Sequence, residues 1–371
     1  MNLMTSNSNK NICIIIPSLN PDPSLIDFIQ KLSEKYQYPV VVVNDGSASE
    51  YDPVFSELES ISGVSVLYHY VNLGKGRALK TAFNFCIGHF PDLCGVVTAD
   101  ADGQHLPEDI LKCIESLQKN PDKLILGCRE FKKNIPWKSK FGNVLTRNIF
   151  YIVSGGRKLT DTQTGLRGIP VAFMKQLMNC KGERFEFETE MLLSAIDSHI
   201  NYHIVSITTV YKNDNRETHF DPLRDSIRIY NILFKYLLRS FFKFVLSSVS
   251  AAILDIALFA LLFNFVCPAL NIPRLFWSVF LARGISSLYN YFVNRCYVFK
   301  SGTGFFDIKS LAGYYSLCGI IFLGSYYGLR LTMRFFGTTD VVIQKIIVDL
   351  ILFLLAFAIQ RNFIFQKGKI S

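Results

Sequence analysis

The sequence lacks the cysteine patterns that identify disulfide-rich and zinc-binding proteins. Its nine cysteines are scattered, and they form no Cys-x-x-Cys pair and no cluster with histidine. A disulfide framework or a structural zinc site is therefore not expected. Most of these cysteines should instead be small buried apolar residues.

A secretion signal and a P-loop are also missing. The N-terminal stretch "MNLMTSNSNKN" is polar, so no signal peptide is expected and the first domain should remain in the cytosol. The stretch "NLGKGRAL" places Lys75 between two glycines but lacks the Gly-x-x-x-x-Gly-Lys spacing of a P-loop. It either approaches a diphosphate or simply begins a helix.

Acidic residues become scarce in the second half of the chain. The protein has 371 residues, a formal charge of +9 and 50% hydrophobic residues, and this length predicts two or three domains. From about Phe241 onward the sequence consists of long apolar runs that contain many phenylalanines. The chain is therefore expected to begin with a soluble part and to continue with a membrane part.

The soluble part alternates between two patterns. Short apolar runs, typical of buried strands, are separated by stretches with helical spacing. The apolar runs are Ile12–Ser18, Tyr38–Ser47, Val64–Val71, Cys94–Asp100 and Lys123–Arg129, and the helical stretches are Pro23–Tyr36, Gly76–Phe90 and Pro107–Asn120. This alternation predicts βαβ units and an α/β fold with a mostly parallel sheet.

Polar residues follow several of the predicted strands. Ser18, Asn20, Asp45, Asp100 and Asp102 all fall at carboxyl ends, where ligands bind in such sheets. Each residue alone is also typical of a turn. Their convergence on one edge favours a binding site there.

The stretch "DADGQH" indicates either a turn or a metal site. Carboxylate and amide oxygens suit Mg²⁺ or Mn²⁺, which commonly bind one or two carboxylates together with substrate phosphates. In an extended chain, Asp100, Asp102 and Gln104 would face the same side and could meet one ion. His105 would then point elsewhere, and it is interpreted as structural.

Five stretches in order, "NDGS", "NLGKGRALKTAF", "DADGQHLPEDI", "LGCR" and "DTQTGLRG", resemble family 2 glycosyltransferases of the GT-A fold. The resemblance covers roughly residues 11 to 230. It is greatest to the branch of dolichyl-phosphate mannose synthase and bactoprenol glucosyltransferase. It implies an α/β GT-A (Rossmann-like) catalytic domain that uses a nucleotide-sugar and a divalent cation.

The resemblance also implies roles for individual residues. Asp100 and Asp102, with Gln104, would hold the metal and through it the donor diphosphate, and Arg129 would meet phosphate or sugar charge near the reaction centre. The residues implied in donor binding are Pro17, Asn20, Asp45, Lys75, Ala101, Arg216 and His219. Relatives often carry acids just after the first-strand Asn, whereas this chain reads "NPDPS".

The chemistry of the acceptor depends on cations. An acceptor alcohol needs a general base, whereas an acceptor phosphate is already ionised and needs positive charge to approach an anionic donor. The candidate cations for the acceptor phosphate are Arg129, Lys138, Lys140, Arg147 and Arg167. Lys138 and Lys140 could equally belong to a solvated face. Glu188 and Glu190 could bind sugar hydroxyls, but helix capping and solvation is the favoured interpretation.

The second half contains four apolar segments that are long enough to cross a bilayer, which takes about 20 residues. They are Phe242–Val266, Leu275–Phe299, Leu311–Phe336 and Val341–Phe365. A basic amphipathic stretch precedes them and suits a helix in the headgroup plane. The expected parts are a catalytic domain (1–220), a juxtamembrane helix (221–241) and a domain with four transmembrane helices (242–371).

Basic residues set the expected orientation of the membrane part. Lysines and arginines are concentrated before the first segment, between the second and third, and in the C-terminal tail. Arg330 and Arg334, near the second external loop, run against this distribution. The positive-inside rule then predicts a multi-pass protein of the cytoplasmic membrane, with the catalytic domain and both termini in the cytosol.

Residues 240 to 366 resemble the GtrA-like four-helix membrane family, through "FFKFVLSSVSAAILDIALFALL", "SSLYNYFVNRCYVF" and "FAIQRNFIF". Asp255, Arg283 and Asp349 lie within the first, second and fourth segments. A rise of about 1.5 Å per residue puts the three at nearly the same depth, so one buried cluster is expected. The cluster would either lock the bundle together or bind the lipid's phosphate or sugar in transit.

Three functions remain open. The favoured one is a metal-dependent inverting transfer of sugar from a nucleotide-sugar, with UDP favoured over GDP-mannose, to polyprenyl phosphate. The second is translocation of the lipid-linked sugar, with the soluble half feeding the membrane half. A processive polysaccharide synthase is disfavoured, because no Gln-x-x-Arg-Trp motif is present and all four segments follow the catalytic domain. Membrane lipids are expected partners, nucleic acid is not, and homo-oligomerisation is left open.

Overall fold

The computed structural model describes residues 12–129, 146–156, 159, 161–208, 221, 224–270, 272–301, 306–337 and 340–365. The chain divides into two compact units. The first unit comprises residues 1–150, 158–233 and 370–371, and the second comprises residues 151–157 and 234–369.

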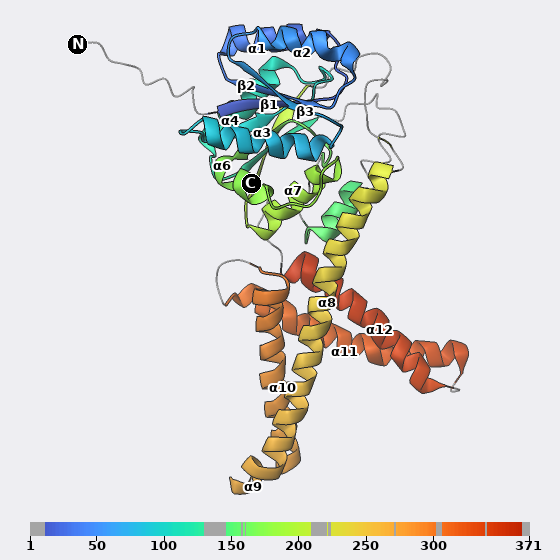
Figure 1. The fold of residues 1–371 in the computed structure, drawn as a ribbon. Coiled ribbons are helices and arrows are strands. Elements are labelled where there is room, and N and C mark those ends of the chain that lie inside the picture. The colour runs from blue at the N-terminus through green and yellow to red at the C-terminus, as the bar shows by residue number, and fades with distance from the viewer. Residues whose placement is uncertain are drawn as a thin grey trace, which may run out of the picture. The chain divides into compact units, whose positions relative to one another are not determined.

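A seven-stranded sheet forms the centre of the first unit (Figure 1). Its strand order is β3-β2-β1-β4-β6-β5-β7. The strands are β1 (Ile12–Ser18), β2 (Val40–Asp45), β3 (Val64–His69), β4 (Gly95–Thr98), β5 (Leu124–Arg129), β6 (Arg167–Pro170) and β7 (Tyr202–Ile207). All neighbours pair in parallel except β6, which is antiparallel to both β4 and β5. The mostly parallel α/β architecture expected from the sequence is therefore confirmed.

The strand register brings the predicted polar residues to one edge. Thr98, the last residue of β4, is paired with Ile15 of β1 and with Arg167, the first residue of β6. Because β1, β2, β4 and β5 run in the same direction, their carboxyl ends meet there. The segments that follow β4 and precede β6 therefore lie beside each other.

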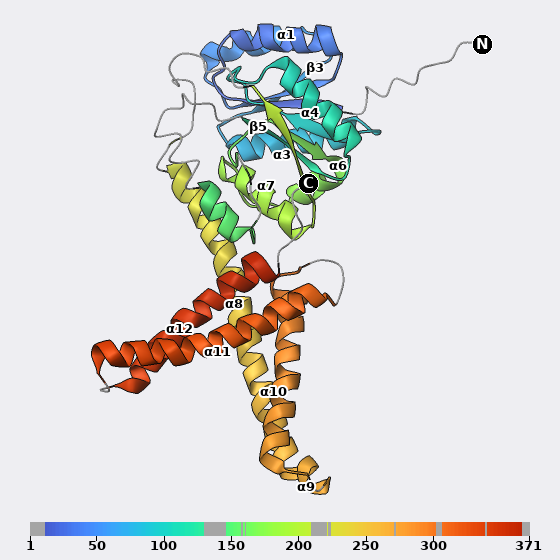
Figure 2. The same ribbon diagram turned by 180° about the vertical axis from the view of Figure 1, so that it is seen from behind.

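Helices cover both faces of the sheet (Figure 2). One face carries α1 (Ser24–Tyr36), α2 (Asp52–Glu59) and α4 (Pro107–Lys119), and the other carries α3 (Lys75–His89), α6 (Val171–Leu177) and α7 (Glu186–Asp197). A short 3₁₀ helix, η2 (Ser49–Tyr51), precedes α2.

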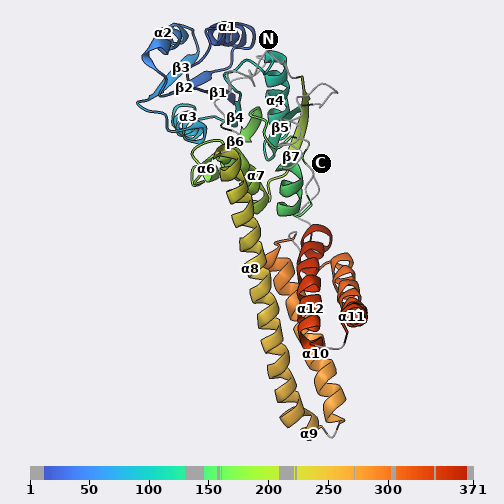
Figure 3. The same cartoon turned by 90° about the vertical axis from the view of Figure 1, so that its right-hand side faces the viewer.

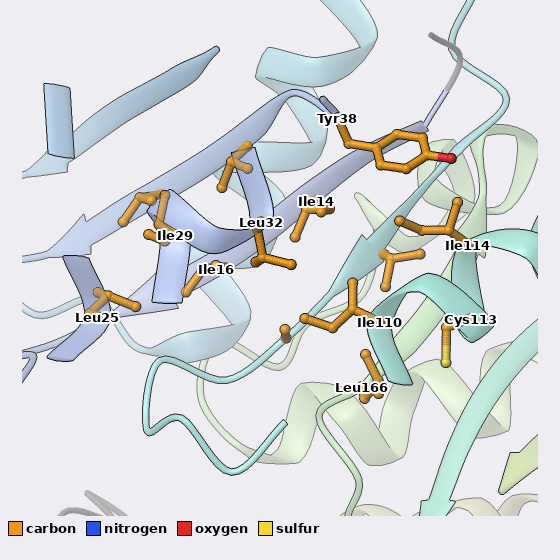
Figure 4. Close-up of a cluster of buried hydrophobic side chains, with 14 of the residues drawn as sticks. Ile14, Ile16, Leu25, Ile29, Leu32, Tyr38, Ile110, Cys113, Ile114 and Leu166 are labelled. Atoms are coloured by element: carbon orange, nitrogen blue, oxygen red, sulfur yellow. The ribbon is translucent and has the colours of Figure 1, made fainter. Parts of the chain in front are cut away.

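The core on the α1 side follows from helical spacing. Leu25, Ile29 and Leu32 recur at intervals of three and four residues, so they lie on one face of α1 and are buried. They pack with Ile110 of α4 and with Ile14 of β1 in one apolar cluster (Figure 4). This packing fixes the strands whose ends carry the polar residues.

The second unit is helical. It contains most of α8 (Arg224–Leu261), then η3 (Leu262–Val266), α9 (Cys267–Ala269), α10 (Arg274–Val293), η4 (Asn294–Val298), α11 (Ile308–Phe336), α12 (Val341–Ile359) and η5 (Gln360–Ile364). The segments η3, η4 and η5 are π-helical. Figure 3 shows α8 beside α10 and α11 beside α12.

Two expectations for this region need correction. The amphipathic stretch is not a separate helix, because α8 continues from Arg224 to Leu261 without interruption. In the part of the chain that the structure describes, three helices are long and apolar enough to span a membrane: Arg224–Val266, Ile308–Phe336 and Val341–Ile364. The helix α10, which covers the second predicted segment, is not among them, because Arg283, Ser286, Ser287 and Asn290 reduce its hydropathy.

Candidate active site

A chain of charged side chains lies at the carboxyl edge of the sheet. The ammonium group of Lys75, the first residue of α3, lies 2.6 Å from Oδ1 of Asp100 and 2.7 Å from Oε1 of Glu188. The ring of His105 lies 3.3 Å from the other oxygen of Asp100. These residues come from the start of α3, the turn after β4 and α7, so the fold assembles the cluster from distant parts of the sequence.

Within the cluster, Lys75 and Asp100 each favour the charged form of the other. Burial alone would lower the pKa of Lys75, but the carboxylates of Asp100 and Glu188 outweigh it and raise that pKa above its ordinary value. Burial alone would raise the pKa of Asp100, but Lys75 and His105 hold it well below its ordinary value. The carboxylate at position 100 is therefore ionised at neutral pH.

Residues 101 to 104 form a turn, which corrects the expected extended geometry. The side chain of Asp102 accepts a hydrogen bond of 3.0 Å from the backbone N–H of Gln104, and Gly103 has a positive φ of 67°. His105 is consequently turned toward Asp100, so the prediction that its ring points elsewhere was wrong. The stretch is therefore a turn, and this turn can still present Asp100 and Asp102 to a metal ion.

The donor set fits a hard divalent cation. Burial and the negative charge of Asp100 raise the pKa of Asp102, so a positive ion beside both carboxylates would relieve their repulsion. Among the described residues, no three side chains of His, Cys, Asp or Glu gather at a single point. Two carboxylates and an amide would thus leave positions for donor phosphate oxygens, which is how Mg²⁺ is commonly held.

Arg129 is oriented by a buried carboxylate that sequence reasoning did not single out. Its Nε lies 2.6 Å from Oδ2 of Asp161 and its Nη2 lies 3.3 Å from Oδ1, so the pair is bidentate. The side chain of Asp161 is fully buried, whereas that of Arg129 is partly exposed. Such a pair fixes the direction of the guanidinium at the end of β5.

The segment before β6 packs against Asp100 through Gly165. A Cβ atom at Gly165 would lie 2.3 Å from the carboxylate of Asp100, so a larger residue would displace that carboxylate. The hydroxyl of Thr98 donates to the carbonyl of Gly165 at 2.7 Å. The stretch "DTQTGLRG" therefore shapes the site by contacting the first carboxylate.

Arg167 is not available to an acceptor phosphate, which corrects its assignment. Its side chain is 1% exposed, and its guanidinium donates to the backbone carbonyls of Thr164 at 2.9 Å and Glu188 at 2.6 Å. A buried cation needs such partners, and these hydrogen bonds are internal. Arg167 therefore joins β6 to α7.

The acid Glu188 belongs to the site, whereas Glu190 does not. Glu188 is buried and bonded to Lys75, so the solvation interpretation for it was wrong. Glu190 accepts a hydrogen bond of 2.7 Å from the backbone N–H of Gly182, so it holds the loop before α7. Sequence spacing gave no signal for this difference, because both residues lie in one helix.

The predicted donor residues Asp45, at the end of β2, and Asn20, just after β1, are held in place by hydrogen bonds. Asp45 is buried, and its carboxylate accepts from the backbone N–H groups of Leu73 and Gly74 and lies 2.7 Å from the ring of His69. Asn20 accepts from the backbone N–H of Ala48 at 3.0 Å. Asp45 and Asn20 thus shape the loops at this edge.

The sheet edge also contains a buried hydroxyl without a partner. Ser18, directly after Pro17 on β1, is 3% exposed and its Oγ has no hydrogen-bond partner among the described residues. Buried polar groups normally have partners, so this oxygen is suited to contact a ligand. Ala101 lies half-buried in the turn between the two aspartates.

One further predicted cation lies on a helix formed by residues 146–153. Arg147 is half-buried on this helix. The predicted residues Lys138, Lys140, Arg216 and His219 lie outside the described residues.

In the second unit, Asp255, Arg283 and Asp349 do not form one cluster as predicted. Arg283 lies 3.4 Å from Asp255, as expected, and Ser286 also donates to Asp255 at 2.8 Å. Asp349 instead pairs with Lys345 and accepts from Ser325 at 2.7 Å, so the single cluster of three residues was wrong. Lys345 lies one turn before Asp349 on α12 and supplies its partner from the same helix.

Arg283 lines an apolar groove of about 960 Å³. Its side chain is 75% exposed. The groove is otherwise lined mainly by α10, including Phe276, Val279 and Phe280, with Tyr315 of α11.

Comparison with protein families accounts for both parts of the chain. Residues 13–178 match the model described as "Glycosyl transferase family 2". Residues 243–365 match the model described as "GtrA/DPMS, transmembrane domain". The first match includes the Asp100 turn, and the second includes all of α10 to α12.

Several curated proteins are similar to the first part. An uncharacterised protein of Methanocaldococcus jannaschii is 29% identical over 62% of this chain and 93% of its own length. UDP-N-acetylglucosamine–dolichyl-phosphate N-acetylglucosaminyltransferase of Methanococcus voltae is 30% identical over 55% of this chain and 87% of its own length. Undecaprenyl-phosphate 4-deoxy-4-formamido-L-arabinose transferase of Edwardsiella ictaluri is 26% identical over 46% of this chain and 52% of its own length.

A solved structure is also similar to this part. Glucosyl-3-phosphoglycerate synthase from Mycobacterium tuberculosis, solved with Mn²⁺, uridine diphosphate and phosphoglyceric acid, is 14% identical with a TM-score of 0.47. The similarity covers 62% of this chain and 78% of that one.

Proposed function

The chain belongs to glycosyl transferase family 2 and is a polyprenyl-phosphate glycosyltransferase, and we propose that it takes the sugar from a UDP-sugar with inversion at the anomeric carbon. The observation that carries the proposal is the pair of carboxylates at Asp100 and Asp102, set beside the Lys75–Glu188 pair at the carboxyl edge of the sheet. The relative from Methanococcus voltae supports UDP as the nucleotide.

The donor end of the site would neutralise the leaving diphosphate. A bound Mg²⁺ or Mn²⁺, held by Asp100, Asp102 and Gln104, would supply positive charge to the diphosphate. Lys75 lies 2.6 Å from Asp100 and adds a second positive charge at the same place. Glu188 holds that ammonium group from the other side and keeps it directed toward the carboxylates.

The acceptor end needs cations and no general base. A phosphate monoester has a second pKa of about 6, so its oxygen is already a nucleophile at neutral pH. Arg129, directed by Asp161, and the half-buried Arg147 are the described cations suited to bring this oxygen to the sugar. A single displacement opposite the leaving diphosphate inverts the anomeric carbon.

A panel of donors tests the proposal. Purified full-length protein would be incubated with undecaprenyl phosphate or dolichyl phosphate and with radiolabelled UDP-N-acetylglucosamine, UDP-glucose or GDP-mannose. Label in an organic-soluble, acid-labile product is expected from a UDP-sugar. Label from GDP-mannose alone would contradict the choice of nucleotide, and label in a polar polymer would indicate a processive synthase.

The groove beside Arg283 favours a second candidate function, translocation of the product. An ion pair between α8 and α10 that opens to an apolar groove could accept a lipid chain together with a charged headgroup. In this proposal the catalytic part lies on the cytosolic side, in agreement with the distribution of basic residues.

A further inference from the structure

The helical unit contains a repeated motif. The stretches "YFVNRCYVF" (Tyr291–Phe299) and "FAIQRNFIF" (Phe357–Phe365) align without gaps, each residue lying 66 positions from its counterpart. Arg295 corresponds to Arg361, and the aromatic and branched apolar positions also correspond, except that Phe292 aligns with Ala358. The first stretch ends the α8–α10 hairpin, and the second ends the α11–α12 hairpin.

The two stretches share an unusual backbone. Residues Asn294–Val298 and Gln360–Ile364 are both π-helical, and the two segments are equivalent in the alignment. The closing hydrogen bonds are also equivalent, from Phe299 to the carbonyl of Asn294 at 2.9 Å and from Phe365 to that of Gln360 at 2.7 Å. Because π-helical turns are rare, agreement at the same five positions indicates a true repeat.

Contacts between the stretches are reciprocal. Asn294 donates to the side chain of its own counterpart, Gln360, at 3.1 Å, and the rings of Phe299 and Phe365 stack at 5.5 Å. Tyr291 contacts Phe365 at 5.7 Å, and the equivalent pair, Phe357 and Phe299, is separated by 6.0 Å. Such a pattern is the mark of a local two-fold axis, here within one chain.

The symmetry fails at the arginines. Arg295 donates to Ser310 at 2.8 Å and lies 3.6 Å from Asp307, which begins the next helix. The positions equivalent to Asp307 and Ser310 in the other half are Phe241 and Phe244, whose side chains accept no hydrogen bond. Arg361 instead lies over the rings of Tyr236 and Phe357 and donates to the backbone carbonyl of Val153.

The carbonyl that accepts from Arg361 belongs to Val153, the last residue of a helix. Helix 146–153 is terminated by Gly155 and Gly156 with φ of 75° and 90°, and Gly156 donates to the carbonyl of Tyr151 at 2.9 Å. The last carbonyls of a helix need donors from outside it. Arg361 supplies one while 5% exposed, and Val153, Gly155 and Arg361 line one small cavity.

We propose that the helical unit is an internal duplication in which Arg361 has become a positioning residue for the acceptor phosphate. It does so by capping helix 146–153, which carries Arg147 less than two turns before Val153. This inference rests on the proposed role of Arg147 at the acceptor. The equivalent Arg295 contacts the start of the helix that follows it, α11.

Paired variants test the proposal in the full-length protein. Arg361→Gln is expected to raise the KM for undecaprenyl phosphate by roughly tenfold, the effect of losing one charged hydrogen bond, and to leave the KM for the UDP-sugar within about twofold. Arg361→Lys, which keeps one charged donor, should restore part of the difference. Arg295→Gln is the matched control and should lower thermal stability without separating the two KM values.

Hydrogen exchange provides a readout that does not depend on activity. Arg361→Gln should speed amide exchange in residues 151–156, and Arg295→Gln should leave that segment unchanged. Gly155→Ala, whose Cβ would approach the Arg361 carbonyl at 3.3 Å, tests the same link if Arg361→Gln fails to fold. Equal effects of the two arginine variants, or unchanged exchange in residues 151–156, would overturn the proposal. Changed exchange with an unchanged acceptor KM would also overturn it, because loss of the cap would then not reach the acceptor phosphate. Failure of the proposed role of Arg147 would show separately, as an unchanged acceptor KM in Arg147→Ala.

Discussion

At the scale of single residues, Asp102 gives the most direct test of a metal. The change Asp102→Asn removes a charge but keeps an oxygen that can accept from the N–H of Gln104. Transfer to lipid is expected to fall by roughly 100-fold or more, because the charge that would bind the cation is lost. Radiolabelled sugar in the lipid phase measures this, and EDTA should inactivate the unchanged protein in the same assay.

The exposed Asp122, in the turn before β5, is the matched control. Asp122→Asn removes a carboxylate at the amino end of β5, away from the carboxyl edge of the sheet, and should leave activity unchanged. Full activity of the unchanged protein in EDTA would refute metal dependence, whatever the behaviour of the variants.

Arg129 and Arg147 should affect the acceptor more than the donor. Replacing either by Ala is expected to reduce transfer at low polyprenyl phosphate by roughly tenfold or more, with nucleotide affinity by calorimetry nearly unchanged. Asp161→Asn should act in the same direction as Arg129→Ala, because the bidentate pair that directs the guanidinium is lost. Equal losses of nucleotide affinity and transfer would assign these residues to the donor instead.

At the scale of elements, Arg167 connects β6 to α7 and should govern stability. Arg167→Met leaves the buried carbonyls of Thr164 and Glu188 without their donor, so a loss of about 3 kcal/mol in unfolding free energy is expected. Thermal unfolding of the detergent-solubilised chain measures it. An unchanged melting temperature together with a raised KM for the lipid would return Arg167 to the acceptor site.

The sequence predicted elements whose pattern is local and missed those defined by distant contacts. The runs at β1 to β5 and the spacing of α1, α3 and α4 were sufficient, because buried strands and amphipathic helices are encoded within each segment. The strand β6 was missed, since "RGIP" has only four residues and contains Gly and Pro. It is a strand because β4 and β5 flank it on both sides.

The same distinction applies to the site. Motif spacing identified Asp100, Asp102 and Lys75, which lie close to their own strand or helix ends. It did not single out Asp161, and it favoured capping and solvation for Glu188. Each of these acids acts through a partner more than thirty positions away, as the pairs with Arg129 and Lys75 show. It also placed His105 wrongly, since the metal interpretation assumed an extended chain and residues 101 to 104 form a turn.

At the scale of the whole molecule, synthesis and translocation should be separable. Arg283→Leu removes the cation beside Asp255 and enlarges the apolar lining of the groove. If this groove passes the product, synthesis of lipid-linked sugar should stay within about twofold while its appearance in the opposite leaflet of proteoliposomes is lost. In proteoliposomes whose enzyme is accessible to the donor from one side only, a membrane-impermeant probe of the sugar measures how much product appears in the opposite leaflet.

Arg334→Leu, on α11 outside the groove, controls for the loss of a membrane arginine. If Arg283→Leu fails to yield folded protein, the ion pair serves to hold the bundle together. Unchanged translocation by a folded Arg283→Leu protein would exclude the groove as a route.

The position of β6 in the sheet also sets an order in time. A ribosome releases β4 and β5 well before residue 167, yet the two strands are not neighbours and are joined only through β6. Strands β1 to β4 can pair as soon as they emerge, whereas β5 must wait for roughly forty further residues. The end of β5, which carries Arg129, therefore joins the sheet edge that carries Asp100 late during synthesis, and a nascent chain that stops before Arg167 carries both motifs without the strand that joins β5 to β4.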